Sequence, residues 1–349
     1  MTRPRSQQVA LDATPYYHCI SRCVRRAFLC GEDHFSGRSF EHRKAWVVER
    51  MAQLAEIFAI DLCAYAVMSN HYHLVVRINA EEANEWSLQE VAERWMHLFR
   101  GVPLVKSWLA GTMTGKAEEL KCQEIIEGWR AKLHDLSWFM RCLNEYIARR
   151  ANQEDVCTGR FWEGRFKSQA LLDEAAVLSC MTYVDLNPIR AGVADLPENS
   201  DHTSIQQRVV QQKASKASEA ANPASESLPR ATTGASPQMP RLLPFVEAIN
   251  ADDPERDAVC DYRLMDYLEL VDWTGRAIRE DKRGAIPEQV PAILCRLHID
   301  RDTWLKHMRP RRNRMLVAIG ALDRLRAYVA ATGRNWLIGR QEASALSSG

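Results

Sequence analysis

The chain has 349 residues, which exceeds one ordinary domain and leaves ample length for a sizeable core. Its 46% hydrophobic and 26% charged content is typical of a globular protein, and neither a membrane-spanning run nor a secretory signal is apparent, so we expect a cytoplasmic protein without membrane contact. The net charge of +1 excludes DNA binding through bulk basicity, because residues 1–210 hold 25 Lys and Arg against 27 Asp and Glu.

The first hundred residues alternate between strand and helix patterns. Residues 16–22 predict a first strand, and apolar residues at helical spacing predict a helix over residues 40–60. Residues 61–67 and 71–78 predict two more strands, and a second helical pattern covers residues 87–99. The order is therefore strand, helix, strand, strand, helix.

A helical insertion and one late strand follow. Residues 101–150 indicate the insertion, and residues 168–172 predict the strand. The complete order matches a split βαβ arrangement, so the predicted fold class is α+β with a ferredoxin-like antiparallel sheet.

The next helix is predicted over residues 173–186. Asp173 suits its N-cap, and Asn187 and Pro188 are expected to stop it. Tyr183 and Asn187 are four residues apart, which puts them on one face, where a phenol and an amide oxygen could serve as nucleophile and metal ligand. The alternative is a core aromatic residue followed by a plain helix cap.

The C-terminal third differs in composition from the rest. Residues 211–240 are rich in Ala, Ser and Pro with almost no large apolar residue, which predicts a disordered linker. Helical periodicity returns beyond it, so we expect residues 1–210 to form one domain and residues 241–349 a second, helical domain of unknown role.

Two histidines stand at the start of the strand predicted over residues 71–78. Side chains alternate between the faces of a strand, so His71 and His73 point the same way while Tyr72 points the other way. Two neighbouring imidazoles can hold one divalent cation. The alternative is a pair of surface histidines on an edge strand.

Cations and aromatic rings alternate just before the last strand. The cations are Arg160, Arg165 and Lys167, and the rings are Phe161, Trp162 and Phe166. Rings that stack unpaired bases next to cations that hold phosphates suit single-stranded or hairpin DNA. A loop anchored in the core by Trp162 is the compatible alternative, and Arg22 at the end of the first strand is a further candidate DNA contact.

Four motifs together resemble the HUH single-tyrosine transposases, and most closely the REP-associated tyrosine transposases of bacteria. They cover about the first 200 residues and nothing beyond. The motifs are Tyr17-His18-Cys19-Ile20-Ser21-Arg22, Met68-Ser69-Asn70-His71-Tyr72-His73-Leu74, Gly159-Arg160-Phe161-Trp162-Glu163-Gly164-Arg165-Phe166-Lys167-Ser168 and Tyr183-Val184-Asp185-Leu186-Asn187-Pro188-Ile189-Arg190-Ala191-Gly192.

The resemblance implies roles for four of these residues. His71 and His73 would bind Mg²⁺ or Mn²⁺, Tyr183 would attack DNA, and Asn187 would complete the metal site. Tyr146 is a rival nucleophile, but the residue four positions after it is an arginine, which cannot ligate a cation.

The expected function is cleavage and rejoining of DNA at hairpin or palindromic repeat ends through a 5′-phosphotyrosine intermediate. One alternative is a replication initiator or relaxase, which shares the two-histidine site and the tyrosine. Another is a domesticated DNA-binding regulator without chemistry. The expected partner is single-stranded or hairpin DNA, and the resemblance leaves a monomer and a homodimer both open.

Overall fold

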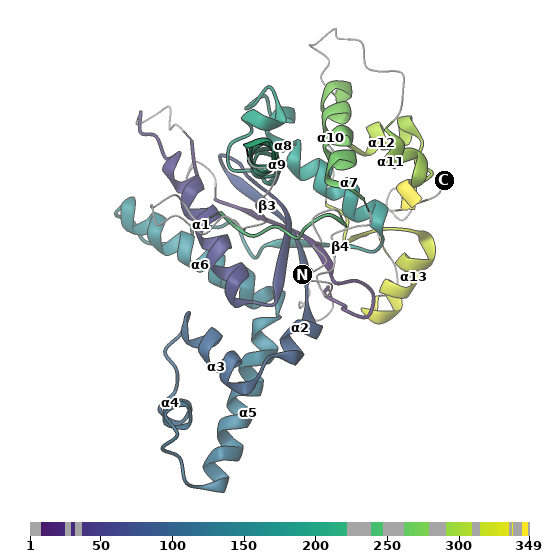
Figure 1. Cartoon of the computed structure of the whole chain (residues 1–349). Coiled ribbons are helices and arrows are strands. Elements are labelled where there is room, and N and C mark those ends of the chain that lie inside the picture. The colour runs from purple at the N-terminus through teal and green to yellow at the C-terminus, as the bar shows by residue number, and fades with distance from the viewer. Residues whose placement is uncertain are drawn as a thin grey trace.

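The structure is a computed structural model of the whole chain. It describes residues 8–24, 29–31, 37–221, 239–246, 262–278, 291–308, 315–334, 337 and 344–347. The fold is α+β: helices lie on both sides of one central sheet, and a helical arm extends away from it (Figure 1).

The sheet has five strands in the order β2-β3-β1-β4-β5. The strands are β1 (Tyr16–Arg22), β2 (Ile60–Val67), β3 (His71–Ile78), β4 (Lys167–Leu171) and β5 (Ala318–Ile319). Pairing is antiparallel from β2 through β4 and parallel between β4 and β5. The four strands predicted from the sequence are confirmed and pair in an antiparallel manner, and the parallel strand β5, which was not predicted, makes the sheet mixed.

Helices α1 (His42–Ile57) and α6 (Leu136–Glu154) pack together on one face of the sheet. Tyr72 reaches this layer, because its hydroxyl donates a 2.7 Å hydrogen bond to Asn144 on α6. Arg43 of α1 is buried and pairs with Glu154 and Asp155 at the end of α6, which joins the two helices. The second half of the predicted insertion is therefore a layer of the sheet domain.

Helix α7 (Glu174–Asp185) covers the opposite face. Its N-cap is Asp173, as predicted, and the Asp173 carboxylate accepts a 2.9 Å hydrogen bond from the Ala176 backbone N–H. The helix ends one residue earlier than predicted, at Asp185. Leu186 leaves helical geometry, and Asn187 begins the short helix α8 (Asn187–Arg190).

A buried carboxyl group joins α7 to two later helices. Asp185 is fully buried and accepts hydrogen bonds from the hydroxyls of Ser204 on α9 (Ser204–Ala221) and Tyr267 on α10 (Leu264–Ile278). Burial raises the pKa of Asp185 to about 6, which its hydrogen bonds and the nearby Arg208 only partly oppose.

The helical arm comprises α2 (Ala80–Glu85), α3 (Leu88–Met96), α4 (Pro103–Leu109) and α5 (Lys116–Leu133). Trp95 and Trp129 stack with centroids 5.4 Å apart, and the rings of Phe99 and Trp138 pack against Trp95. These aromatic residues give the arm its own apolar centre.

The C-terminal part packs on α7 and extends the sheet. Its remaining elements are α11 (Ala292–Arg296), α12 (Arg301–Met308), α13 (Leu322–Ala331) and the 3₁₀ turn Ala345–Ser347, and another 3₁₀ turn, Pro197–Asn199, precedes α9. Gly320, with φ +152°, ends β5 where an added Cβ would lie 2.7 Å from Leu172 Cβ, so only glycine allows this approach. The expectation of an all-helical C-terminal part is wrong in this detail, since β5 belongs to it.

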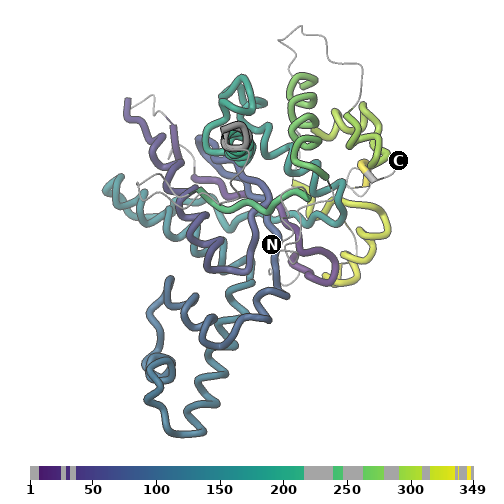
Figure 2. Tube along the Cα trace, in the orientation of Figure 1, coloured from purple at the N-terminus to yellow at the C-terminus, as the bar shows by residue number. Residues whose placement is uncertain are grey.

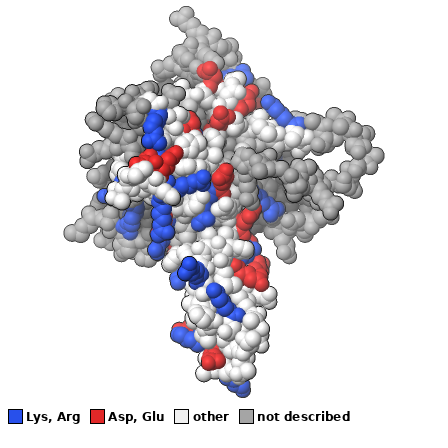
Figure 3. Space-filling view, turned by 90° about the vertical axis from the view of Figure 1, so that its left-hand side faces the viewer, with Lys and Arg blue, Asp and Glu red and all other residues white. Residues whose placement is uncertain are grey.

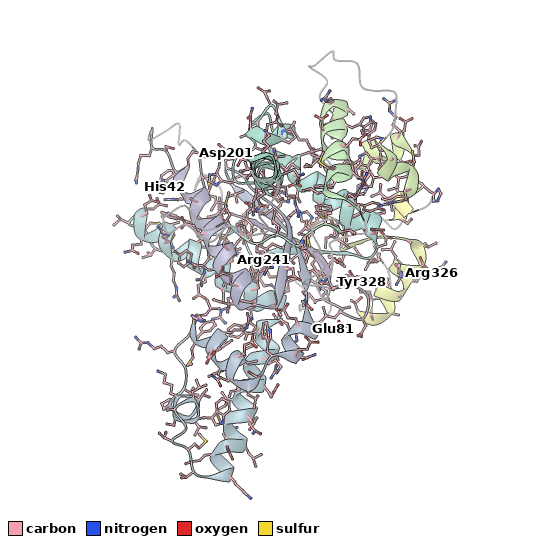
Figure 4. The ribbon with its side chains drawn as sticks, viewed as in Figure 1. His42, Glu81, Asp201, Arg241, Arg326 and Tyr328 are labelled. Carbon is pink, nitrogen blue, oxygen red and sulfur yellow. The ribbon has the colours of Figure 1, made fainter. Side chains whose placement is uncertain are left out.

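The two ends of the described chain also meet. In Figure 2 the N-terminal loop lies beside the C-terminal part, and the hydroxyl of Tyr328 on α13, labelled in Figure 4, donates a 2.8 Å hydrogen bond to the Gln8 carbonyl. The predicted linker begins inside a helix, because α9 continues to Ala221, and residues 222–238 of it lie outside the described residues. The division into two domains stays a prediction. Within the described residues, no helix combines the length and apolar character needed to span a membrane.

The buried Asp185 generates a stability prediction. Tyr267→Phe keeps the ring contact with Phe245 but leaves the carboxyl group without one of its two hydroxyl donors. We expect the free energy of unfolding to fall by about 1–3 kcal/mol in urea titrations at pH 7. Tyr146→Phe is the matched control, because its hydroxyl bonds the partly exposed Arg150 near the surface, and it should cost less than about 0.5 kcal/mol. Equal losses in the two variants would contradict the prediction.

Candidate functional site

The pairing of β1 with β3 determines which side chains share the α7 face. Ile20 lies opposite His73, and Arg22 lies opposite His71. Directly opposed residues point to the same face and alternate positions do likewise, so His18 joins this set. Tyr72 points to the other face, where its hydroxyl meets α6.

The two histidines predicted as ligands lie side by side. Their ring centroids are 4.9 Å apart. His71 Nδ1 lies 2.6 Å from Asn70 Oδ1, and His73 Nδ1 lies 2.9 Å from His18 Nε2. Each ring is therefore held through Nδ1, which leaves Nε2 as the nitrogen available to a ligand.

Helices α7 and α8 bring the other two predicted residues to these rings. Asn187 Nδ2 lies 3.2 Å from His73 Nε2. The Tyr183 ring packs edge-on against His73, with centroids 5.9 Å apart, and against His18 at 6.3 Å. The structure thus brings together His71, His73, Tyr183 and Asn187. Asn187 reaches the site from α8, and not as a continuation of the Tyr183 helix.

Burial keeps the imidazoles of this site uncharged. It lowers the pKa of His18 to about 4 and that of His71 to about 4. The pKa of His73 is held well below its usual range by burial first, and then by His18, His71 and the charge of Arg190. At neutral pH all three rings are neutral, the form in which imidazole binds a metal. No cluster of three His, Cys, Asp or Glu side chains suited to a metal ion occurs among the described residues, so the candidate donor set is two imidazoles and one amide.

Two residues near Tyr183 were not predicted as site residues. His18 contacts His73 and Tyr183, and Arg190 lies over the Tyr183 ring with its guanidinium carbon 4.3 Å from the centroid. Arg190 Nε is buried and has no hydrogen-bond partner in the described part of the chain. Both residues belong to motifs quoted above, but their closeness to Tyr183 depends on strand register and on the turn at Leu186, which the sequence does not reveal.

The rival tyrosine has different neighbours. Tyr146 lies on α6, on the face opposite α7, where its hydroxyl accepts a 3.0 Å hydrogen bond from Arg150 and its ring faces Arg50. Neither neighbour is a metal-ligating type.

The aromatic residues of the segment from 160 to 167 belong to the core. Phe161, Trp162 and Phe166 are buried, Trp162 Nε1 donates a 2.8 Å hydrogen bond to the Asn144 carbonyl, and its ring packs on Tyr72. The prediction that these rings stack unpaired bases is therefore not supported, and the anchored-loop alternative describes them.

The predicted DNA-contacting cations are distributed around this loop. Lys167 is exposed and lies opposite Ile20, so Ile20 separates it from His73 across the sheet. Arg22 is exposed beside Glu163 at 3.7 Å, and Arg165 is exposed in the loop before β4. Arg160 instead donates a 2.9 Å hydrogen bond to the Trp162 carbonyl of its own loop. All four side chains are exposed, and Arg160 differs in that its guanidinium is hydrogen-bonded to the backbone of its own loop.

The face that carries α1 and α6 has side chains of both charges. On the face with α1 and α6, Lys and Arg side chains occur with Asp and Glu between them (Figure 3). Arg141 and Arg149 of α6 both pair with Glu145. A single continuous basic surface is not visible on this face.

Comparisons with known proteins give one similarity. No protein-family model matches the chain, and no curated protein matches it. Among solved structures the chain is similar to a REP-associated tyrosine transposase bound to a REP hairpin, with 9% identity and a TM-score of 0.34 over 70% of this chain and 99% of that chain. This similarity is too slight to assign a family or an activity.

The depressed histidine pKa values generate a prediction for the metal-free protein. The pKa of His71 is about 4 in the folded chain and near 6.5 when unfolded, so the unfolded chain binds more protons between these values. Stability should therefore fall as pH falls from 7 to 4.5, and His71→Gln should remove about 2 kcal/mol of that fall in urea titrations with EDTA.

Two controls accompany this comparison. The pKa of Asp185 is raised, so its contribution is lost as pH rises through 6, but it is present in both proteins and cancels. His97→Gln, which changes an exposed histidine, should leave the pH dependence of stability unchanged. If the unfolding free energy of His71→Gln depends on pH as strongly as that of the wild type, His71 is accessible to protons in the folded chain.

Proposed function

We propose that the chain is a metal-dependent tyrosine transposase, a single-strand DNA endonuclease that cuts and rejoins DNA at hairpin or palindromic repeat ends. The observation that carries the proposal is the convergence of Tyr183, Asn187, His71 and His73. Asn187 and His73 are 114 positions apart in the sequence and come from different elements, yet their side chains are 3.2 Å apart. If Tyr183 were only a core aromatic residue and Asn187 only a helix cap, contact between Asn187 and His73 would not be needed.

The sheet order supports the proposal. Strands β2-β3-β1-β4 are antiparallel, and helices α1 and α6 connect them on one face. This order is consistent with the split βαβ arrangement of ferredoxin-like type that is expected for an HUH nuclease core. Helix α7 then carries the proposed nucleophile on the opposite face.

The donor set fits a divalent cation. His71 and His73 would each offer Nε2, and Asn187 would offer its amide oxygen after a half-turn of the amide group. Two imidazoles beside one oxygen suit Mn²⁺ better than Mg²⁺, which prefers oxygen ligands alone. When bound, the cation would neutralise charge on the scissile phosphate.

The chemistry of cleavage falls to Tyr183. Its phenolic oxygen attacks phosphorus, a bond from this oxygen to phosphorus forms, and the bond to the 3′ oxygen breaks. The products are a 5′-phosphotyrosine and a free 3′-hydroxyl, which receives the proton that the phenol loses. Attack by another 3′-hydroxyl on the phosphotyrosine reverses these changes and joins the strands, so no external energy source is needed.

Exposed cations at one end of the sheet, together with Arg190, would contact the DNA. Arg22, Arg165 and Lys167 are exposed toward the histidine end of the sheet and would contact backbone phosphates. Arg190 would oppose the negative charge that develops beside the Tyr183 ring. In-line attack requires flexible DNA, which favours single strands next to a hairpin.

Two other functions use the same residues. A replication initiator or relaxase would nick at a replication or transfer origin, whereas a transposase would transfer strands between repeat ends. A domesticated regulator would bind the hairpin and leave it intact. Wild-type protein is incubated in Mn²⁺ with palindromic DNA from the flanks of the coding sequence. The products distinguish the transposase, the initiator or relaxase, and the non-catalytic regulator.

The sharpest prediction concerns the covalent link. Tyr183→Phe removes only a hydroxyl, so folding and hairpin binding should persist, while cleavage and the denaturation-resistant DNA adduct should fall at least about 10³-fold. Tyr146→Phe is the matched control and should keep the adduct. The measurement is attachment of a labelled hairpin oligonucleotide in Mn²⁺, resolved on a denaturing gel. Attachment to the Tyr183→Phe protein, or peptide mapping of the label to Tyr146, would refute the assignment.

A second prediction concerns the phosphate contacts. Arg165→Ala with Lys167→Ala should weaken hairpin binding and reduce the slope of log affinity against log salt by about two units. Arg141→Ala with Arg149→Ala removes two exposed cations of α6 and should leave the slope within about half a unit of wild type. Fluorescence anisotropy over a salt series measures both. An unchanged slope in the first pair would make Arg165 and Lys167 structural.

A further inference from the structure

The two ring nitrogens of His73 face different neighbours. Nε2 faces Asn187, and Nδ1 lies 2.9 Å from Nε2 of His18, a ring stacked on His73 at a centroid distance of 5.1 Å and an angle of 17°. Two neutral imidazoles in this contact share one proton, because one nitrogen must donate and the other must accept. Which of them donates decides whether His73 Nε2 carries a lone pair or a proton.

The partner of His18 decides this question. In the pairing of β1 with β4, His18 lies directly opposite Gln169, so the two side chains share a face, and hydrogen bonding by Gln169 partly opposes the lowering of the His18 pKa by burial. Since Nε2 of His18 faces His73, the nitrogen that remains for Gln169 is Nδ1. Both side chains are buried, so water does not compete for these bonds.

Gln169 is oriented in turn by the C-terminal part of the chain. Its amide nitrogen donates a 2.8 Å hydrogen bond to the Leu316 carbonyl. A carbonyl only accepts, so this contact fixes the Gln169 amide nitrogen toward Leu316 and leaves its oxygen for His18. The next residues hold the carbonyl in position, because the Ala170 N–H donates to the Val317 carbonyl at 2.9 Å and β5 follows.

These contacts determine which ring nitrogens of His18 and His73 carry protons. Gln169 oxygen accepts from His18 Nδ1–H, His18 Nε2 accepts from His73 Nδ1–H, and His73 Nε2 keeps its lone pair. We infer that Gln169 and His18 are positioning residues that fix His73 in its metal-binding tautomer, with the Leu316 carbonyl as the anchor. The role in metal binding rests on the proposed function, because it concerns the same site.

The bond from Gln169 to the Leu316 carbonyl disfavours the other tautomer of His73. If His73 carried its proton on Nε2, His18 would have to donate from Nε2 and accept on Nδ1. Gln169 would then either donate to both His18 and the Leu316 carbonyl from its one amide nitrogen, which leaves its oxygen without the His18 donor, or turn its oxygen toward that carbonyl, which sets two acceptors against each other. Outer contacts of this kind orient metal-binding histidines in general.

Binding of Mn²⁺ to the full-length chain without DNA tests the inference. We expect Gln169→Leu and His18→Leu to weaken Mn²⁺ binding about 10–100-fold by calorimetry. His18→Gln, which can accept from His73 and donate to Gln169, should stay within about 3-fold of wild type. Gln207→Leu is the matched control: Gln207 is equally buried and donates a 2.7 Å hydrogen bond to the Pro240 carbonyl, but it does not contact the histidines.

Nitrogen-15 spectra of the histidine side chains report the tautomers directly. Wild-type protein without metal should show protons on Nδ1 of both His18 and His73, and Gln169→Leu should show a mixture at His73. Wild-type His73 with its proton on Nε2 would overturn the inference, whether or not the variants fold. Wild-type Mn²⁺ affinity in a folded Gln169→Leu protein would overturn it too.

These readouts separate the inference from the proposed function. If labelled hairpin DNA attaches to Tyr183 but the Gln169→Leu variant binds Mn²⁺ like wild type, only the positioning role fails. If wild-type protein binds no Mn²⁺ and forms no DNA adduct, the proposed function fails, and the wild-type spectrum still reports whether the contacts set the tautomer.

Discussion

The register between β1 and β3 is the constraint on which the site depends. With Ile20 opposite His73, both candidate ligands and His18 occupy one face, and α7 packs over them. A slip of one residue would turn every side chain of β3 to the other face, which would bury the histidines against α6 and expose Tyr72 to α7. The bond from Tyr72 to Asn144 on α6 and the contact of His73 with His18 hold the register from opposite sides.

The site combines rigid strands with a helix that ends early. Because α7 stops at Asp185, the chain turns at Leu186, and Asn187 starts a new helix that also carries Arg190 back over the Tyr183 ring. A continuous helix would have carried Arg190 almost two turns beyond Tyr183 along its axis. The break therefore brings the Asn187 amide to His73 and the Arg190 guanidinium to the Tyr183 ring.

Local sequence patterns predicted the helices and strands, but they could not predict which distant strands pair. Alternation placed His71 and His73 on one face of a strand, and helical spacing put Tyr183 near Asn187, and the structure brings all four together. His18 was missed because its meeting with His73 depends on pairing between strands more than fifty residues apart. The two-residue strand β5 leaves no periodic signal. Two interpretations of Trp162 stayed open, because an aromatic ring between cations looks the same in a core loop and on a binding surface, and the structure buries this ring.

The parallel addition of β5 to β4 has a consequence for the order of events during synthesis. A ribosome that has made 200 residues has already made every residue proposed for cleavage, but the carbonyl that orients Gln169 belongs to residue 316. The nascent chain therefore holds an unanchored Gln169 until residue 316 has been made. On the proposed function, His73 would reach its metal-binding tautomer only after the C-terminal part had been made, and not when the sheet first forms.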